Sequence, residues 1–132
     1  MSVPEPGDVH VVERTFTADA VTDFAALSRD TQSIHTEEDP PMVHGLLTAT
    51  LPTQIGGDLN VLARTMSFEF VEPVYAGDTV RCEWTTTSVD ERADRYDLTA
   101  DVVCDRITAP NASTDGTRVL EGHLEGLVWR RS

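Results

Sequence analysis

The sequence contains no lysine. Its ten basic residues are all arginine and stand against 23 acidic residues, which gives a formal net charge of −13. Such a charge repels the phosphates of nucleic acids and of anionic lipids, so neither is expected as a partner. A dense carboxylate surface is also typical of proteins that work in concentrated salt, where self-repulsion is screened. We therefore expect a protein of a halophilic, high-salt cytoplasm.

Long hydrophobic runs are absent too. No stretch approaches the roughly 18 apolar residues that a membrane-spanning helix needs. The opening residues, MSVPEPGDVHVVER, have neither the positive nor the apolar region of a secretory signal. We therefore expect a cytoplasmic protein that makes no membrane contact. Cys82 and Cys104 have no CxxC spacing and are expected to be buried reduced thiols, with a disulfide allowed only if they are cross-strand neighbours.

What is present suffices for one hydrophobic core. The chain has 132 residues, 39% of them hydrophobic, so we expect a single domain over residues 1–132. Thr17 is a suitable N-cap for a short amphipathic helix that ends at Ser28. Gly122 and Gly126 are expected to mark bulges or close approaches in the last strand. Alternating hydrophobicity predicts strands at residues 9–16, 61–72, 79–89, 96–107 and 118–130, with a loop at 108–116.

An almost uncharged segment at residues 42–55 is typical of a buried helix. Pro52 is expected to kink or end this helix, and Gly56-Gly57-Asp58 to close it. The strands are joined by short turns, which favour antiparallel neighbours over parallel crossovers. The prediction is an α+β fold in which a strongly curved antiparallel sheet wraps around one central apolar helix.

Residues 28–45 (SRDTQSIHTEEDPPMVHG) are the chemically richest part of the chain. Asp30 and His35 lie five residues apart in a polar loop, and Gly45 follows where the apolar helix begins. A carboxylate and an imidazole together suit general acid–base chemistry, and a helix start stabilises negative charge. Each residue also has a plainer interpretation. Asp30 is a residue type that shapes loops after helices, and a single histidine such as His35 is more often structural than catalytic.

Several short motifs resemble those of one protein family, and they occur in the same order and with similar spacing. They are residues 24–30 (FAALSRD), 34–35 (IH), 43–47 (VHGLL), 68–70 (FEF) and 73–78 (PVYAGD). The set resembles the MaoC-like dehydratases, and more narrowly the (R)-specific enoyl-CoA hydratases of fatty acid metabolism, which have the hot-dog fold. The chain departs from the family pattern at Arg29 and at Gln32-Ser33, where Asn-Pro is common. The segment between His35 and His44 is also shorter than usual.

The resemblance implies a hydro-lyase that reversibly adds water to trans-2-enoyl-CoA and forms (R)-3-hydroxyacyl-CoA. Asp30 and His35 would be the catalytic pair that holds the water, with either one as the base. The backbone N–H of Gly45 would stabilise the thioester oxygen. Thr53 would supply a hydroxyl near the aspartate, and His44 would hold the start of the helix. No metal is implied, and no cofactor beyond the coenzyme A thioester that serves as substrate.

Two other functions stay open. Hot-dog acyl-CoA thioesterases often carry a carboxylate on the central helix, but residues 45–55 contain no Asp or Glu. A non-catalytic thioester-binding subunit of a hetero-oligomeric hydratase would explain the short segment after His35. An open sheet edge predicts a homodimer or higher homo-oligomer with the site near the interface. Arg64 and Arg81 are candidates for binding the CoA phosphates, and the acyl carrier can be CoA or a carrier protein.

Overall fold

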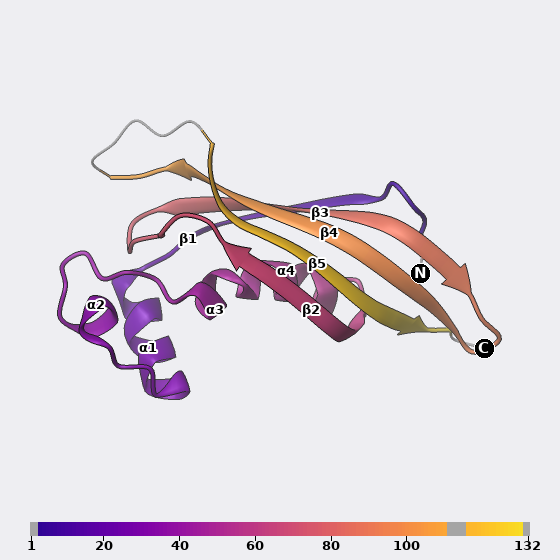
Figure 1. Cartoon of the computed structure of the whole chain (residues 1–132), viewed down its shortest axis with the longest axis horizontal. Coiled ribbons are helices and arrows are strands. Elements are labelled where there is room, and N and C mark those ends of the chain that lie inside the picture. Colours follow the sequence, from indigo (N-terminus) through magenta and orange to yellow (C-terminus); the bar gives the residue numbers. More distant parts are fainter. Residues whose placement is uncertain (1–2, 111–115, 131–132) are drawn as a thin grey trace.

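The computed structural model describes residues 3–110 and 116–130. In these residues five strands and four helices follow one another (Figure 1). The strands are β1 (Val9–Thr15), β2 (Leu62–Phe70), β3 (Thr79–Glu91), β4 (Arg95–Thr108) and β5 (Thr117–Trp129). The helices are α1 (Ala18–Ser28), α2 (Ser33–Thr36), α3 (Gly45–Thr48) and α4 (Thr50–Asp58). None of these described helices is long and apolar enough to cross a membrane. All five predicted strands are confirmed, and the predicted loop at 108–116 lies partly outside the described residues.

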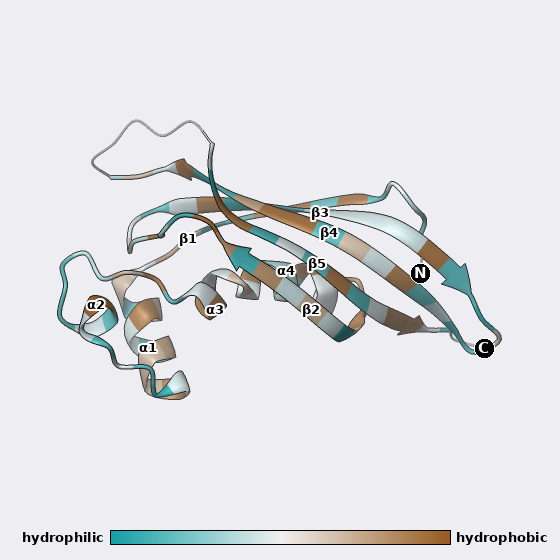
Figure 2. Ribbon diagram, viewed as in Figure 1, coloured by the Kyte–Doolittle hydropathy of each residue, from teal (hydrophilic) through white to brown (hydrophobic). Residues whose placement is uncertain are grey.

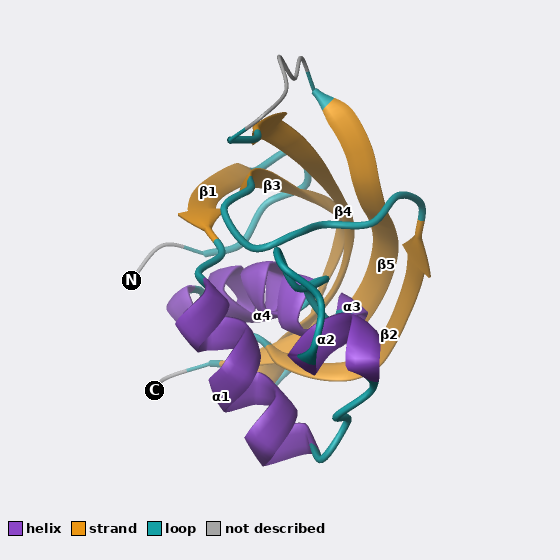
Figure 3. Ribbon diagram, turned by 90° about the vertical axis from the view of Figure 1, so that its left-hand side faces the viewer, coloured by secondary structure: helices purple, strands orange, loops and turns teal. Residues whose placement is uncertain are grey.

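The strands form one antiparallel sheet in the order β1-β3-β4-β5-β2. Buried residues alternate with more exposed ones along β3 and β4, because successive side chains point to opposite faces of a sheet. Figure 2 shows this alternation as brown and teal bands along the strands. Figure 3 shows the sheet curving around α4, with α1 and α2 beside it. The predicted α+β architecture, a curved antiparallel sheet around a central helix, is confirmed.

The central helix and the concave face of the sheet share one core. Leu51 and Ile55 on α4 are almost fully buried. Trp84 on β3 lies against the same helix, because a Cβ added to Gly56 would come within 3.7 Å of its ring. The indole N–H of Trp84 donates to the hydroxyl of Thr86 at 3.0 Å, so this large side chain is buried without an unpaired donor.

The central helix is in two pieces, in keeping with the kink predicted from Pro52, but it does not start at residue 42 as predicted. It begins only at Gly45, and it is interrupted at Ala49, between α3 and α4. Pro52 explains the interruption, because its ring clashes with the carbonyl four residues earlier and it has no N–H to donate. The helix runs through both glycines and ends at Asp58, which is the last residue of the predicted closing signal Gly56-Gly57-Asp58.

Helix α1 begins and ends at residues that fix the position of the following loop. The Thr17 hydroxyl accepts a hydrogen bond from the N–H of Ala20 at 3.1 Å, which confirms the predicted N-cap. Arg29 ends the helix in the left-handed conformation with φ of 62°. A residue with a Cβ costs about 1–2 kcal/mol in that conformation. The sequence did not predict α2, which carries His35, because one turn is too short to show a hydrophobic period.

Strand β2 forms one edge of the sheet and, in the described chain, pairs with β5 alone. Two glycines on β5 allow this pairing. A Cβ on Gly122 would lie 2.6 Å from the ring of Phe68, and one on Gly126 would lie 2.6 Å from the Leu62 carbonyl oxygen. Both glycines are therefore points of close approach, as predicted.

Cys82 and Cys104 face each other across β3 and β4. Both are fully buried free thiols, as predicted, and they also meet the condition of being cross-strand neighbours. A hydrogen bond with Cys82 and burial both raise the pKa of the Cys104 thiol. A raised pKa keeps the thiol protonated at neutral pH, so the pair packs as two small apolar groups.

Candidate functional site

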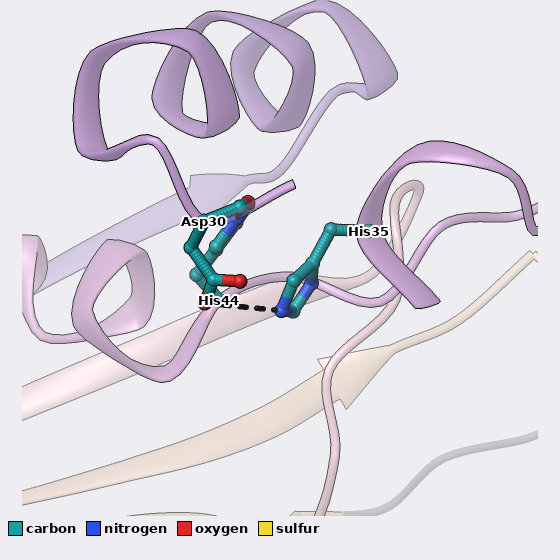
Figure 4. Close-up of side chains that lie close together, drawn as sticks. All are labelled: Asp30, His35 and His44. Carbon is teal, nitrogen blue, oxygen red and sulfur yellow. Dashed lines mark hydrogen bonds and ion pairs between the residues drawn. The ribbon is translucent and has the colours of Figure 1, made fainter. Parts of the chain in front are cut away.

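Three side chains from the segment between α1 and α3 converge at one point. One polar side-chain atom from each of Asp30, His35 and His44 lies within 4.8 Å of the other two (Figure 4). Asp30 follows the end of α1, His35 lies in α2, and His44 immediately precedes α3. The two histidines are buried, with exposed fractions of 7% and 3%, whereas the side chain of Asp30 is 40% exposed. The site therefore has two buried imidazoles and one carboxylate that reaches solvent.

The tautomer of His35 is set by a main-chain carbonyl. Nδ1 of His35 lies 2.6 Å from the carbonyl oxygen of Met42. Because a carbonyl only accepts hydrogen bonds, Nδ1 carries the proton and Nε2 keeps its lone pair in the neutral ring. Nε2 lies 3.8 Å from Oδ2 of Asp30, which is too far for a direct hydrogen bond. A bridging water molecule fits a gap of this length.

Gln32 holds the carboxylate of Asp30. Its side-chain amide donates to Oδ1 at 2.8 Å, which leaves Oδ2 facing His35. This hydrogen bond is the main cause of a lowered pKa for Asp30, and partial burial opposes it. A bond from the Gln32 backbone and the charges of His35 and His44 lower the pKa of Asp30 further. The carboxylate therefore stays ionised at a lower pH than an ordinary aspartate does.

His44 contacts both members of the pair. Its Nε2–H donates to the main-chain carbonyl of Asp30 at 2.9 Å. Its ring stacks on that of His35, with centroids 3.6 Å apart and planes 16° apart. Phe24 packs its ring edge-on against His44, with centroids 4.9 Å apart. Nδ1 of His44 is buried and has no hydrogen-bond partner among the described residues. His44 thus fixes the backbone of Asp30 and the ring plane of His35 at once.

The same three side chains are a poor set of metal ligands in this arrangement. Stacked imidazoles direct their in-plane lone pairs side by side rather than toward one ion. One nitrogen of each ring is also already bonded to a main-chain carbonyl. The arrangement suits proton transfer better than coordination.

Gly45 begins α3 immediately after His44. The first N–H groups of a helix have no acceptor inside the helix, and no described residue accepts a hydrogen bond from this one. A Cβ at this position would lie 2.8 Å from the ring of Phe70, so a larger residue requires the ring to move. Gly45 therefore offers a free N–H beside the end of β2.

The turn at residues 73–78 anchors the loop that carries the site. The carbonyl of Val74 accepts a hydrogen bond from the N–H of Val43 at 2.7 Å. The buried carboxylate of Asp78 accepts one from the N–H of Tyr75 at 2.8 Å, which shapes the turn. These contacts explain why this turn and the residues before α3 appear together in the motif set.

Thr53 and the two candidate arginines are not among the three clustered side chains. The hydroxyl of Thr53 donates to the carbonyl of Ala49 at 3.0 Å, and its supporting role near Asp30 stays a prediction. Arg64 lies near the start of β2 beside Asp97 at 4.0 Å, and Arg81 is exposed on β3. Neither arginine lines the two cavities that adjoin Met42. Sequence reasoning also missed the role of Gln32, although it stands where the family often has another amide, Asn.

Comparison with known proteins identifies the family. The model of the family described as "MaoC like domain" matches residues 4–106. The chain belongs to this family. No curated protein sequence gives a significant match.

Solved structures agree in fold. An (R)-hydratase from A. caviae involved in PHA biosynthesis has a TM-score of 0.75 and 26% identity, over 98% of this chain and 100% of that one. R-hydratase PhaJ1 from Pseudomonas aeruginosa has a TM-score of 0.76 and 17% identity, over 98% and 84%. The HadBC (3R-hydroxyacyl-ACP dehydratase) complex from Mycobacterium tuberculosis has a TM-score of 0.67 and 16% identity, over 96% and 99%. The predicted hot-dog fold of the MaoC-like proteins is confirmed.

Proposed function

We propose that this protein is a hydro-lyase that reversibly adds water to trans-2-enoyl-CoA and forms (R)-3-hydroxyacyl-CoA. The observation that carries the proposal is the 3.8 Å gap between Oδ2 of Asp30 and Nε2 of His35. An ionised carboxylate and an imidazole lone pair face each other across it, which are the two acceptors that an attacking water needs. Membership of the MaoC-like family supports the same class of reaction.

In the proposed mechanism the water donates one hydrogen to Nε2 of His35 and the other to Oδ2 of Asp30. Its oxygen attacks C3 of the enoyl thioester while His35 takes the proton, and an enolate forms. The imidazolium then returns a proton from Nε2 to C2, so that H and OH add to one face. Asp30 stays ionised, in keeping with its lowered pKa, and stabilises the imidazolium. Dehydration is the same path in reverse.

The N–H of Gly45 is the proposed donor to the enolate oxygen. It begins a helix and no described residue accepts a hydrogen bond from it, so it is available to a substrate carbonyl. Removing one such donor typically lowers kcat by about 10²–10³-fold. Because α3 is only one turn long, the N–H itself rather than a long helix dipole supplies the stabilisation.

Loss of the enoyl absorbance of crotonyl-CoA in high salt tests this function. We expect activity in the wild type, a loss of about 10²–10⁴-fold in kcat for Asp30→Asn and His35→Ala, and little change for Thr53→Ala. A wild type as inert as the two site variants would refute the hydratase proposal. Release of free thiol would instead identify a thioesterase. Activity that appears only with a partner subunit would identify the chain as part of a hetero-oligomer.

We also propose that the protein assembles as a homodimer or higher homo-oligomer. The open edge of β2 and its half-exposed Leu62 and Met66 support this, because such edges and apolar side chains are usually covered. Sedimentation in high salt measures the mass, and a monomer at micromolar concentration would contradict the proposal. No cofactor beyond the CoA thioester takes part in the proposed reaction.

A further inference from the structure

Residues 41–43 connect the loop that carries the candidate site to the turn at residues 73–78. Met42 and Tyr75 form an isolated antiparallel bridge, with one main-chain hydrogen bond on each side of it. These bonds run from the N–H of Ala76 to the carbonyl of Pro41 at 3.0 Å and from the N–H of Val43 to the carbonyl of Val74 at 2.7 Å. The turn therefore holds the main chain on both sides of Met42.

Both main-chain groups of Met42 are bonded to the segment that carries His35. The N–H of Met42 donates to the carbonyl of Ile34 at 2.8 Å. The carbonyl of Met42 accepts the Nδ1 proton of His35 at 2.6 Å. A displacement of the turn would therefore move the one acceptor that fixes the tautomer of His35.

Arg106 holds the turn from the opposite side. It lies on β4 opposite the fully buried Val80, so its side chain is on the concave face of the sheet. Its Nη1 donates to the carbonyl of Pro73 at 3.0 Å and lies 3.9 Å from Oδ2 of Asp78. Arg106 thus contacts the first and the last residue of the turn.

Stability alone is a poor explanation for an arginine at this position. Its side chain is only 20% exposed, and its Nε is buried without a hydrogen-bond partner among the described residues. A buried donor that makes no hydrogen bond costs free energy of folding. The contacts that the guanidinium does make are directed at the turn, which points to a role in placing it.

We propose that Arg106 is a positioning residue that fixes the tautomer of His35 through the turn at residues 73–78 and the carbonyl of Met42. The inference rests on the proposed function and adds to it a residue that touches neither substrate nor the catalytic pair. Without Arg106 the carbonyl of Met42 is no longer held, and the His35 ring with its proton on Nε2 becomes populated. That tautomer cannot accept a proton from water at Nε2.

The ring ¹⁵N chemical shifts of His35 test this directly, and they need no substrate. His35→Ala assigns the signals among the four histidines of the chain. We expect the Nδ1–H form in the wild type and a mixture of the two forms in Arg106→Met. Arg106→Lys keeps a donor that can reach the carbonyl of Pro73 and should restore the wild-type shifts.

Arg118→Met is the matched control, because Arg118 is also ion-paired, to Asp105 at 2.6 Å, but makes no described contact with the turn. Its His35 shifts should equal those of the wild type. The double variant Arg106→Met/Asp78→Asn removes both charges and replaces the single variant if that one does not fold. Unchanged His35 shifts in a folded variant without Arg106 would overturn the proposal.

Kinetics on crotonyl-CoA give the second readout. We expect Arg106→Met to lower kcat of the folded fraction by on the order of tenfold with KM little changed, and Arg106→Lys to recover most of the loss. A loss that only follows the unfolded fraction in the thermal melt would assign Arg106 to stability and overturn the proposal. If the wild type hydrates no enoyl-CoA, the proposed reaction fails, and the ¹⁵N shifts alone then support or refute the role of Arg106.

Discussion

Different substitutions of His44 test separately the two contacts by which it holds the proposed catalytic pair. Phenylalanine keeps a ring that stacks on His35 but loses the hydrogen bond to the Asp30 carbonyl, which contributes about 0.5–1.5 kcal/mol. Asparagine keeps an amide donor but loses the stacked ring, which contributes about another 0.5–1.5 kcal/mol. Alanine loses both. If these contacts hold the pair in its reactive geometry, the losses appear in kcat as about 2- to 12-fold for each partial variant.

The assay measures kcat and KM on crotonyl-CoA together with the thermal melt of each variant. We expect His44→Ala to lose more than either partial variant, with most of the loss in kcat, because His44 acts through Asp30 and His35. A role confined to stability would lower the melting temperature and leave kcat of the folded fraction unchanged. His44→Ala that is fully folded and keeps kcat within twofold of the wild type would refute the reasoning.

Other changes give equally definite results. Gln32→Ala removes the main cause of the lowered pKa of Asp30, so an NMR titration of the Asp30 carboxyl should show its pKa rise; an unchanged pKa contradicts this. Arg29→Gly relieves a left-handed residue and should raise the free energy of unfolding by about 1 kcal/mol in denaturant titration. Leu51→Ala opens a cavity in the core and should cost about 2–5 kcal/mol on the same scale. The net charge of −13 predicts a thermal melt that rises with salt, and equal melting at low and molar salt would rule out the halophilic interpretation.

The elements with a strong period or a clear cap could be predicted from the sequence. Alternation identified all five strands, and Thr17 identified the start of α1. The interruption of the central helix was also predicted, from Pro52, although the helix begins at Gly45 rather than at residue 42 and the break falls in the turn before the proline. The helix runs through Gly56 and Gly57 and ends at Asp58, the last residue of the predicted Gly56-Gly57-Asp58 signal.

The candidate site was also only partly predictable from the sequence. Spacing and motif resemblance identified Asp30, His35 and Gly45 as candidate site residues. The sequence could not show that Met42 fixes the tautomer of His35, because that contact uses a main-chain carbonyl, which every residue has. Nor could it show that the hydroxyl of Thr53 bonds back to its own helix, because that partner depends on the direction of a helical side chain.

Hydration of crotonyl-CoA in D₂O tests the central claim most directly, because the claim places Asp30 and His35 on one face of the substrate. The account predicts a single product, (R)-3-hydroxybutyryl-CoA with one deuterium at C2, in the diastereomer that syn addition gives. Anti addition, a mixture of C2 diastereomers, or the (S) alcohol would contradict delivery of water and proton by this pair.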